Sequence, residues 1–250
     1  MHYGISHLSI VPVRTGTTDA DEMITQLLYG EHFKVLEKRK KWSKIRTALD
    51  GCEGWITNPQ YTLITELEYN TIVETNVQQY TSDLISFVSP ENNILVPILL
   101  GSSVGQTALL SHAFDGNTAT PTKDKSQLIP MALLYLNAPF LWGGRTPFGI
   151  DSAGFSQMVY KMNGVKLLRT PAEQATQGEA LSFIEESEAG DLAFFDNNEG
   201  VINHVGIIMK NNYIIHVNGA VRIDRIDHTG IFNTTLNNYT HQLRVIKKLI

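Results

Sequence analysis

The chain has 250 residues, of which 42% are hydrophobic and 18% are charged, a composition typical of soluble globular proteins. Its length allows more than one domain. The formal net charge of −5 argues against nucleic acid as a partner, because phosphate binding requires a basic face. A single cysteine, Cys52, excludes an intrachain disulfide, and no apolar run is long enough to span a membrane.

The first 63 residues predict a small all-β domain, because short segments of alternating apolar and polar residues are separated by turn residues. The segments are residues 9–14, 26–31, 33–37, 42–46 and 54–56. Three elements carry a resemblance: Gly-Glu-x-x-x-Val from Gly30, Trp-x-x-Ile-Arg from Trp42, and Gly-Trp-Ile from Gly54. Together they resemble a bacterial SH3 domain, which implies a small barrel over residues 1–63.

Residues 64–122 give weaker signals. Residues 94–101 form an apolar run that predicts a strand, and residues 114–117 predict a turn. We assign this region as a second, degenerate SH3-like β domain from its position and strand composition alone. Residues 118–126 combine proline with mixed charges and predict a linker.

Residues 123–250 place helices first and strands afterwards, which is the order of an α+β domain. A helix is expected over residues 129–136, with Ile129, Leu133, Leu134 and Leu136 as its apolar face. A second helix follows Ser152 and ends near residues 163–164, and a third is expected over residues 171–181. Strands are expected at residues 191–195, 204–209, 212–217 and 243–250.

The most informative stretch is residues 140–155, F-L-W-G-G-R-T-P-F-G-I-D-S-A-G-F. Asp151 stands where a helix N-cap belongs, so Ser152 lies at a helix N-terminus, a position that suits a nucleophile. With Pro139, the stretch resembles the signature of the NlpC/P60 cell-wall cysteine peptidases, which are papain-like. The resemblance implies a papain-like α+β domain over residues 123–250 and no metal or organic cofactor.

The chain departs from that signature at the residues that carry chemistry. The family's nucleophilic cysteine is Ser152, the serine after it is Ala153, and the usual tyrosine before the tryptophan is Phe140. Pro171 stands where relatives often have a small polar residue that touches the peptide. These departures predict weak or absent peptidase activity.

Two histidines complete the candidate site. His204 opens one predicted strand and His216 lies near the end of the next, so antiparallel pairing could bring them side by side. The resemblance implies that His204 is the general base and that His216 orients it. The alternative is a pair of hydrogen-bonded structural histidines with no catalytic role.

Three further residues have two interpretations each. Asp151 contacts substrate in the family but can equally cap its helix, an interaction that contributes about 1 kcal/mol. Trp142 could form a wall of the cleft or pack in the core. In relatives an acidic residue of the first SH3 domain pairs with the free amine of the peptide, and Glu53 is the candidate here; a solvated turn residue is the alternative.

The resemblance implies a γ-D-glutamyl-L-diamino acid endopeptidase that acts on peptidoglycan peptides (muropeptides) with a free N-terminus and that is impaired by Ser152. Two alternatives remain open. One is a pseudoenzyme that binds a cell-wall peptide or a protein, and the other is a hydrolase that uses Ser152 as its nucleophile. The N-terminus lacks a basic region followed by an apolar run, which predicts a cytoplasmic location.

Overall fold

A computed structural model describes residues 2–75, 78–91, 94–197 and 199–250. The chain forms two compact units. The N-terminal unit contains Met1–Pro121 together with Trp142–Gly144, and the C-terminal unit contains Thr122–Leu141 and Arg145–Ile250. Among the described residues, no helix is long and apolar enough to cross a membrane.

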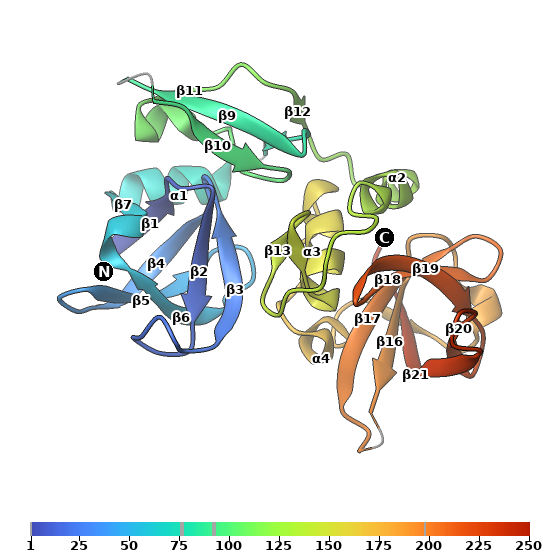
Figure 1. The fold of residues 1–250 in the computed structure, drawn as a ribbon. Coiled ribbons are helices and arrows are strands. Elements are labelled where there is room, and N and C mark those ends of the chain that lie inside the picture. Colours follow the sequence, from blue (N-terminus) through green and yellow to red (C-terminus); the bar gives the residue numbers. More distant parts are fainter. Residues whose placement is uncertain (1, 76–77, 92–93, 198) are drawn as a thin grey trace. The chain divides into compact units, whose positions relative to one another are not determined.

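The N-terminal unit is built on a seven-stranded antiparallel sheet with the order β3-β2-β6-β5-β4-β1-β7 (Figure 1). Its strands are β1 (His2–Ser6), β2 (Ile10–Arg14), β3 (Met23–Leu28), β4 (His32–Lys38), β5 (Trp42–Thr47), β6 (Glu53–Thr57) and β7 (Tyr61–Ile64). Alternate residues point to one face and bury a common core that includes Val11, Val13, Ile45 and Ile56. The alternation therefore predicts this sheet correctly.

A helix that the sequence analysis did not predict follows the sheet. Helix α1 (Glu66–Glu74) begins with a capping box, in which the Thr65 hydroxyl accepts from the Glu68 amide and the Glu68 carboxylate accepts from the Thr65 amide. Tyr69 and Ile72 are its buried residues. The Thr-x-x-Glu spacing was the available signal for this helix.

The rest of this unit contains short strands and small sheets. They are β8 (Tyr80–Thr81), β9 (Ile85–Pro90), β10 (Val96–Leu99), β11 (His112–Ala113) and β12 (Thr118–Ala119). Their core includes Tyr29, the residue after β3, and the Ser103 amide donates to the Tyr29 carbonyl. Gly30, at φ +75°, permits this approach, because a Cβ there would lie 1.9 Å from the Ser103 carbonyl oxygen. Residues 64–121 thus share one compact unit with the first sheet, and a second SH3-like domain stays a prediction.

The expected linker is partly structured. Its first two residues form β12, which pairs with β8, and its end forms a 3₁₀ turn, η3 (Lys125–Gln127). The other 3₁₀ turns are η1 (Asn58–Gln60), η2 (Thr107–Leu110) and η4 (Ile184–Glu186).

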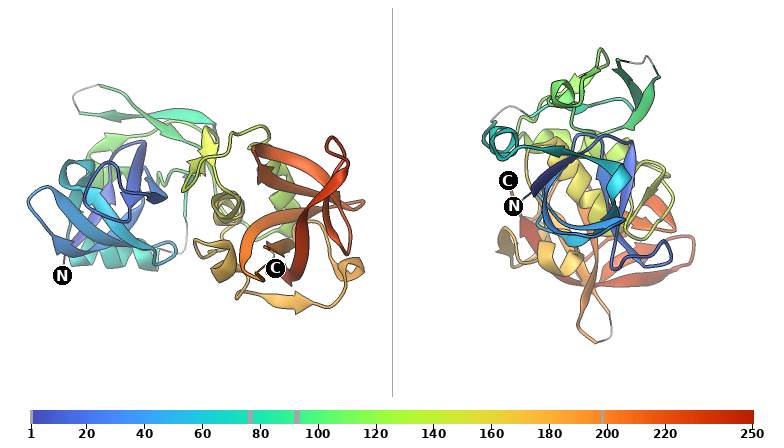
Figure 2. Two further views of the ribbon diagram at one scale, coloured as in Figure 1. Left: turned by 60° about the horizontal axis from the view of Figure 1, so that its bottom comes forward. Right: turned by 90° about the vertical axis from the view of Figure 1, so that its left-hand side faces the viewer.

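The C-terminal unit combines helices with a closed antiparallel barrel (Figure 1 and Figure 2). Its helices are α2 (Leu128–Leu133), α3 (Ser152–Met162) and α4 (Pro171–Gln174). Its strands are the hairpin β13 (Arg145–Thr146) and β14 (Gly149–Ile150), then β15 (Glu179–Leu181), β16 (Leu192–Asp196), β17 (Ile202–Met209), β18 (Tyr213–Asn218), β19 (Ala220–Ile226), β20 (Gly230–Asn233) and β21 (Asn238–Lys248). Strands β16 to β20 pair in sequence and β21 joins β20 to β16, which closes the ring.

The barrel accounts for the continuous apolar run in β16. Ala193 and Phe195 belong to a core cluster with residues of β17 to β21, while Leu192 and Phe194, on the opposite face, are also fully buried. Helix α3 packs against β17 and β18. All residues of α3 are buried, so the helix packs on all of its faces, including that of Phe155, Met158, Val159 and Met162.

Two predictions for this unit are wrong. The predicted apolar face is not the buried one: Leu133, Leu134 and Leu136 are 41–44% exposed. Helix α2 packs on α3, and its buried residues are Leu128 and Ala132. The expected helix over residues 171–181 ends at Gln174. Gly178 then takes a positive φ of 71°, and residues 179–181 become strand β15, paired with β21.

Candidate active site

Ser152 is the first residue of α3 and is almost fully buried. Asp151 precedes it as the N-cap, and its Oδ1 accepts a 2.6 Å hydrogen bond from the Gly154 amide. The first amides of a helix have no partners within the helix, and the dipole end there is positive. The predicted helix and cap are therefore present, and the Ser152 side chain lies at a position that favours developing negative charge.

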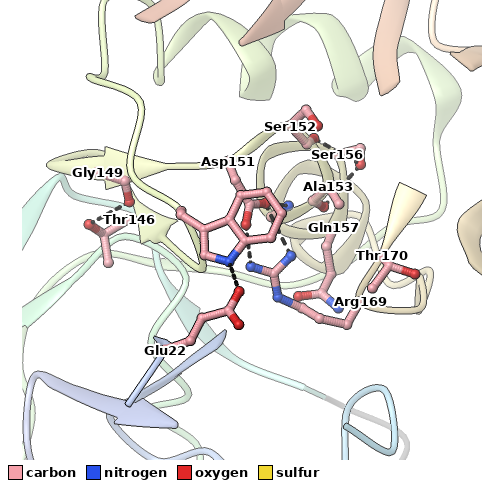
Figure 3. A network of polar contacts seen from close by, with 12 residues as sticks. Glu22, Thr146, Gly149, Asp151, Ser152, Ala153, Ser156, Gln157, Arg169 and Thr170 are labelled. Atoms are coloured by element: carbon pink, nitrogen blue, oxygen red, sulfur yellow. Dashed lines mark hydrogen bonds and ion pairs between the residues drawn. The ribbon is translucent and has the colours of Figure 1, made fainter. Parts of the chain in front are cut away.

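The carboxylate of Asp151 is also held from a second direction (Figure 3). Arg169 forms a bidentate pair with it, with Nη1 3.1 Å from Oδ1 and Nη2 2.6 Å from Oδ2. Both side chains are nearly buried, at 7% and 12% exposure. The structural role of Asp151 is thus observed, while its contact with substrate stays a prediction.

Ala153 and Pro171 lie on α3 and α4, two helices that a hydrogen bond joins. The Ala153 carbonyl accepts from Gln174 Nε2 at 3.0 Å and from the Ser156 hydroxyl at 3.0 Å, so the start of α3 is bound to α4. Pro171 is the first residue of α4, and Thr170 caps that helix. A backbone N–H at the first helical position has no acceptor within the helix, so a proline there loses no hydrogen bond. Their contact with a peptide stays a prediction.

The two predicted histidines do meet. His204 on β17 and His216 on β18 are both buried, and His204 Nε2 lies 2.9 Å from His216 Nδ1. Gly206 is paired with His216 across the strands, and a Cβ at Gly206 would lie 2.9 Å from the His216 Cβ. The absent side chain therefore leaves room for His216 to stand beside its partner.

Two residues that the sequence analysis missed extend this pair. His216 Nε2 lies 3.0 Å from Oδ2 of Asp224 on β19, and Arg222 holds the same carboxylate through Nε at 2.6 Å and Nη2 at 2.9 Å. Arg222 and Asp224 are two residues apart on one strand and so share a face. That Arg-x-Asp spacing was the signal, but nothing local connected it with the histidines.

The hydrogen bonds determine which nitrogen atoms carry protons. Burial raises the pKa of Asp224, but hydrogen bonds from His216 and Arg222 outweigh it and lower the pKa below its usual value. An ionised Asp224 only accepts, so His216 donates from Nε2 and its Nδ1 accepts from Nε2 of His204. Nδ1 of His204 is then left with a lone pair, as a general base requires.

A third histidine, His241 on β21, stacks on His204 with ring centroids 4.0 Å apart. Burial lowers the pKa of all three imidazoles: well below the usual value for His204, and to about 4 for His241. All three are therefore neutral near pH 7. No sequence signal pointed to His241, because only closure of the barrel brings β21 to the site.

Ser152 and His204 lie on packed elements, since α3 packs against β17. Among the described contacts, no hydrogen bond joins the Ser152 hydroxyl to His204. The predicted assignment of Ser152 as nucleophile, His204 as base and His216 as orienting residue therefore stays a prediction, although the histidine pair itself is observed.

The remaining predicted residues have other surroundings. Phe140 is 48% exposed. Trp142, part of the N-terminal unit, is 61% exposed and donates from Nε1 to Glu22 Oε1 at 2.7 Å, so it is not a core residue. Glu53 forms ion pairs with Lys44 and Arg46, which lower its pKa. Its pairing with a peptide amine stays a prediction.

Comparison with known proteins agrees with this architecture. Residues 137–240 match the NlpC/P60 family, and residues 13–60 match the bacterial dipeptidyl-peptidase SH3 domain. The gamma-D-glutamyl-L-lysine dipeptidyl-peptidase of Bacillus cereus is 26% identical over 235 residues, covering 82% of this chain and 70% of the relative. The enzyme of the same name from Bacillus subtilis is 25% identical over 228 residues, covering 81% and 75%.

The fold also has a solved counterpart. A crystal structure of an NlpC/P60 family protein from Bacillus cereus superposes with a TM-score of 0.78 over 98% of this chain and 99% of that chain, at 18% sequence identity. At this identity the likeness concerns the fold alone. The predicted order of an SH3-like β domain followed by an α+β domain is confirmed. The chain thus contains an NlpC/P60 domain preceded by a bacterial dipeptidyl-peptidase SH3 domain, as its motifs predict.

Proposed function

We propose that this protein recognises muropeptides at the γ-D-glutamyl to diamino-acid linkage and cleaves them weakly or not at all. Its relatives named gamma-D-glutamyl-L-lysine dipeptidyl-peptidases support the substrate class. The observation that carries the proposal is the hydroxyl of Ser152 at the start of α3, where the NlpC/P60 signature calls for a thiol.

The chemical reason is acidity. A thiol has a pKa near 8.5, and a helix N-terminus can bring it within reach of neutral pH. A serine hydroxyl is far less acidic, and the helix-terminus effect of about 0.3–2 kcal/mol cannot close that difference. Phe140 also lacks the hydroxyl that the family's tyrosine would offer near the oxyanion, and loss of one such donor costs about 10²–10³ in rate.

One observation favours the alternative of a working serine hydrolase. The chain Arg222–Asp224–His216–His204 orients the base through hydrogen bonds in series, a role that a buried carboxylate fills directly in serine hydrolases. A covalent probe for active-site serine separates this alternative from the leading proposal. The binding-protein alternative predicts calorimetric binding of muropeptides without turnover.

The direct test is cleavage of an L-Ala-γ-D-Glu-diaminopimelate peptide. The unmodified chain should release no product above background, whereas Ser152→Cys should give measurable cleavage, because it places a thiol at the same helix end. Adding Phe140→Tyr should increase the rate, and adding His204→Ala should abolish it. Robust turnover by the unmodified chain would refute the proposal. A folded, inactive Ser152→Cys/Phe140→Tyr variant would instead favour the binding protein.

A further inference from the structure

Three histidines from three strands form a compact group inside the C-terminal unit. His204, His216 and His241 each offer one ring nitrogen, and these atoms all lie within 4.8 Å of one another. Two of the three rings are buried and the third is half-buried. The catalytic assignment uses His204 and His216, and it gives His241 no role.

The spacing is close to that of a metal site. Zinc binds imidazole nitrogen at about 2.0–2.1 Å, so two nitrogens of a tetrahedral site lie about 3.3 Å apart. The observed spacings bracket this value, with 2.9 Å between His204 Nε2 and His216 Nδ1 and at most 4.8 Å to the third nitrogen.

The surrounding hydrogen bonds match those of metal-bound histidines. A ligating histidine usually donates its other N–H to a carboxylate or another oxygen, which orients the ring. His216 does so through Nε2 to Asp224, whose carboxylate is in turn held by Arg222. Nδ1 of His241 lies 2.9 Å from the Thr240 hydroxyl, which can accept its proton and leave Nε2 with a lone pair.

We propose that His204, His216 and His241 form a binding site for a single divalent transition-metal ion of the zinc type. His216 ligates through Nδ1. His204 ligates through Nε2 after its proton moves to Nδ1, a change of tautomer without a change of charge. His241 must turn out of its stack with His204, because parallel rings do not direct their in-plane lone pairs at one point. Three histidines leave the fourth tetrahedral position to water.

A metal ion bound to Nε2 of His204 would leave the proton on Nδ1, so His204 could no longer act as the general base. Binding of zinc and cleavage of peptide would therefore exclude each other, whichever nucleophile stands at residue 152. The metal site is independent of the proposed function, since it needs neither a peptide nor turnover.

The test is a titration of untagged protein, freed of metal, with Zn²⁺ by calorimetry and with Co²⁺ by visible absorption. One equivalent should bind, and Co²⁺ should give the spectrum of a tetrahedral site. His241→Phe, which keeps an aromatic ring, should weaken binding at least tenfold, and Asp224→Asn should weaken it about 10–100-fold. His241→Cys should recover binding, because it returns a ligand to the same place. His228→Phe is the matched control, since His228 is an exposed histidine of the same unit, and it should bind as the unmodified chain does.

Three results would overturn the proposal. The first is no binding by the unmodified chain at 100 micromolar metal. The second is equal affinity in the unmodified chain and in His241→Phe. The third is loss of binding in His228→Phe as large as in His241→Phe. Thermal unfolding of each variant without metal checks that the fold is retained, and the cysteine variant keeps the test decisive if the phenylalanine variant does not fold.

Discussion

Replacing Arg169 by leucine should strongly destabilise the C-terminal unit. The guanidinium makes two charge-assisted hydrogen bonds to Asp151, and the side chains are only 7% and 12% exposed. Arg169→Leu removes both of these charge-assisted bonds from a nearly buried carboxylate, and breaking a buried pair in this way costs about 3–5 kcal/mol of unfolding free energy. The pair also positions Asp151, the N-cap of α3, so the destabilisation should be largest at the start of that helix.

A double-mutant cycle separates the pair from the cap. Asp151→Asn keeps a good N-cap but replaces the carboxylate that Arg169 contacts by a neutral amide, so it should also cost several kcal/mol. The double variant Asp151→Asn/Arg169→Leu removes both members of the charged pair. It should therefore be less destabilised than the sum of the single variants, by about 1–3 kcal/mol. Arg244→Leu is the control, because Arg244 is 64% exposed and lies 3.7 Å from Asp196. It should cost less than about 1 kcal/mol.

The measurement must distinguish the two units. The three tryptophans, Trp42, Trp55 and Trp142, all belong to the N-terminal unit, so their fluorescence does not report on the change. Native-state hydrogen exchange of the α3 amides does, because it gives the free energy of opening that helix. The reasoning is refuted if Arg169→Leu changes the α3 opening free energy by no more than Arg244→Leu does.

Three further expectations follow from single positions. Leu128→Ala should lower the unfolding free energy by about 2–5 kcal/mol because Leu128 is fully buried, whereas Leu136→Ala, at 41% exposure, should stay within about 0.5 kcal/mol. Similar values for both variants would contradict the burial observed at these two positions. Gly206→Ala should displace His216, since the new Cβ would lie 2.9 Å from the His216 Cβ, and unchanged imidazole NMR signals would show that it does not. Glu53→Gln should weaken calorimetric binding of muropeptides with a free N-terminus but not of their N-acetylated forms, and an equal effect on both would exclude Glu53 from amine recognition.

The elements that the sequence predicts well depend on local patterning. Strands β2 and β5 each bury alternate residues, so the pattern that predicts them is visible within five or six residues. The face of α2 is not legible in this way. Leucines occur on more than one side of that helix. Which residues are buried depends on contact with α3, about 20 residues later in the sequence, and the buried ones are Leu128 and Ala132.

Some residues of the candidate site could likewise be predicted from neighbouring segments, and others could not. The pair His204 and His216 could be anticipated because their strands are consecutive, and a hairpin brings consecutive strands together. Asp224 follows one strand later, but its link to His216 depends on register, which the sequence does not show. His241 enters only because β21 closes the barrel between β20 and β16.

The histidine chain has a structural reason to persist whether or not the protein turns over substrate. His204, His216 and Asp224 are buried and hydrogen-bonded in series, and Arg222 holds the carboxylate at the end. Removing any one of them leaves a buried polar group without its partner, which costs about 1–3 kcal/mol and more for a charged group.

Retention of the four residues is therefore poor evidence for catalysis, because folding alone would preserve them. Ser152 differs in kind. Its side chain does not cap α3, because Asp151 does so. Serine and cysteine also have nearly the same volume. The identity of residue 152 has little influence on the fold and a large one on nucleophilicity, so a chemical assay at this position discriminates between enzyme and binding protein where the histidines cannot.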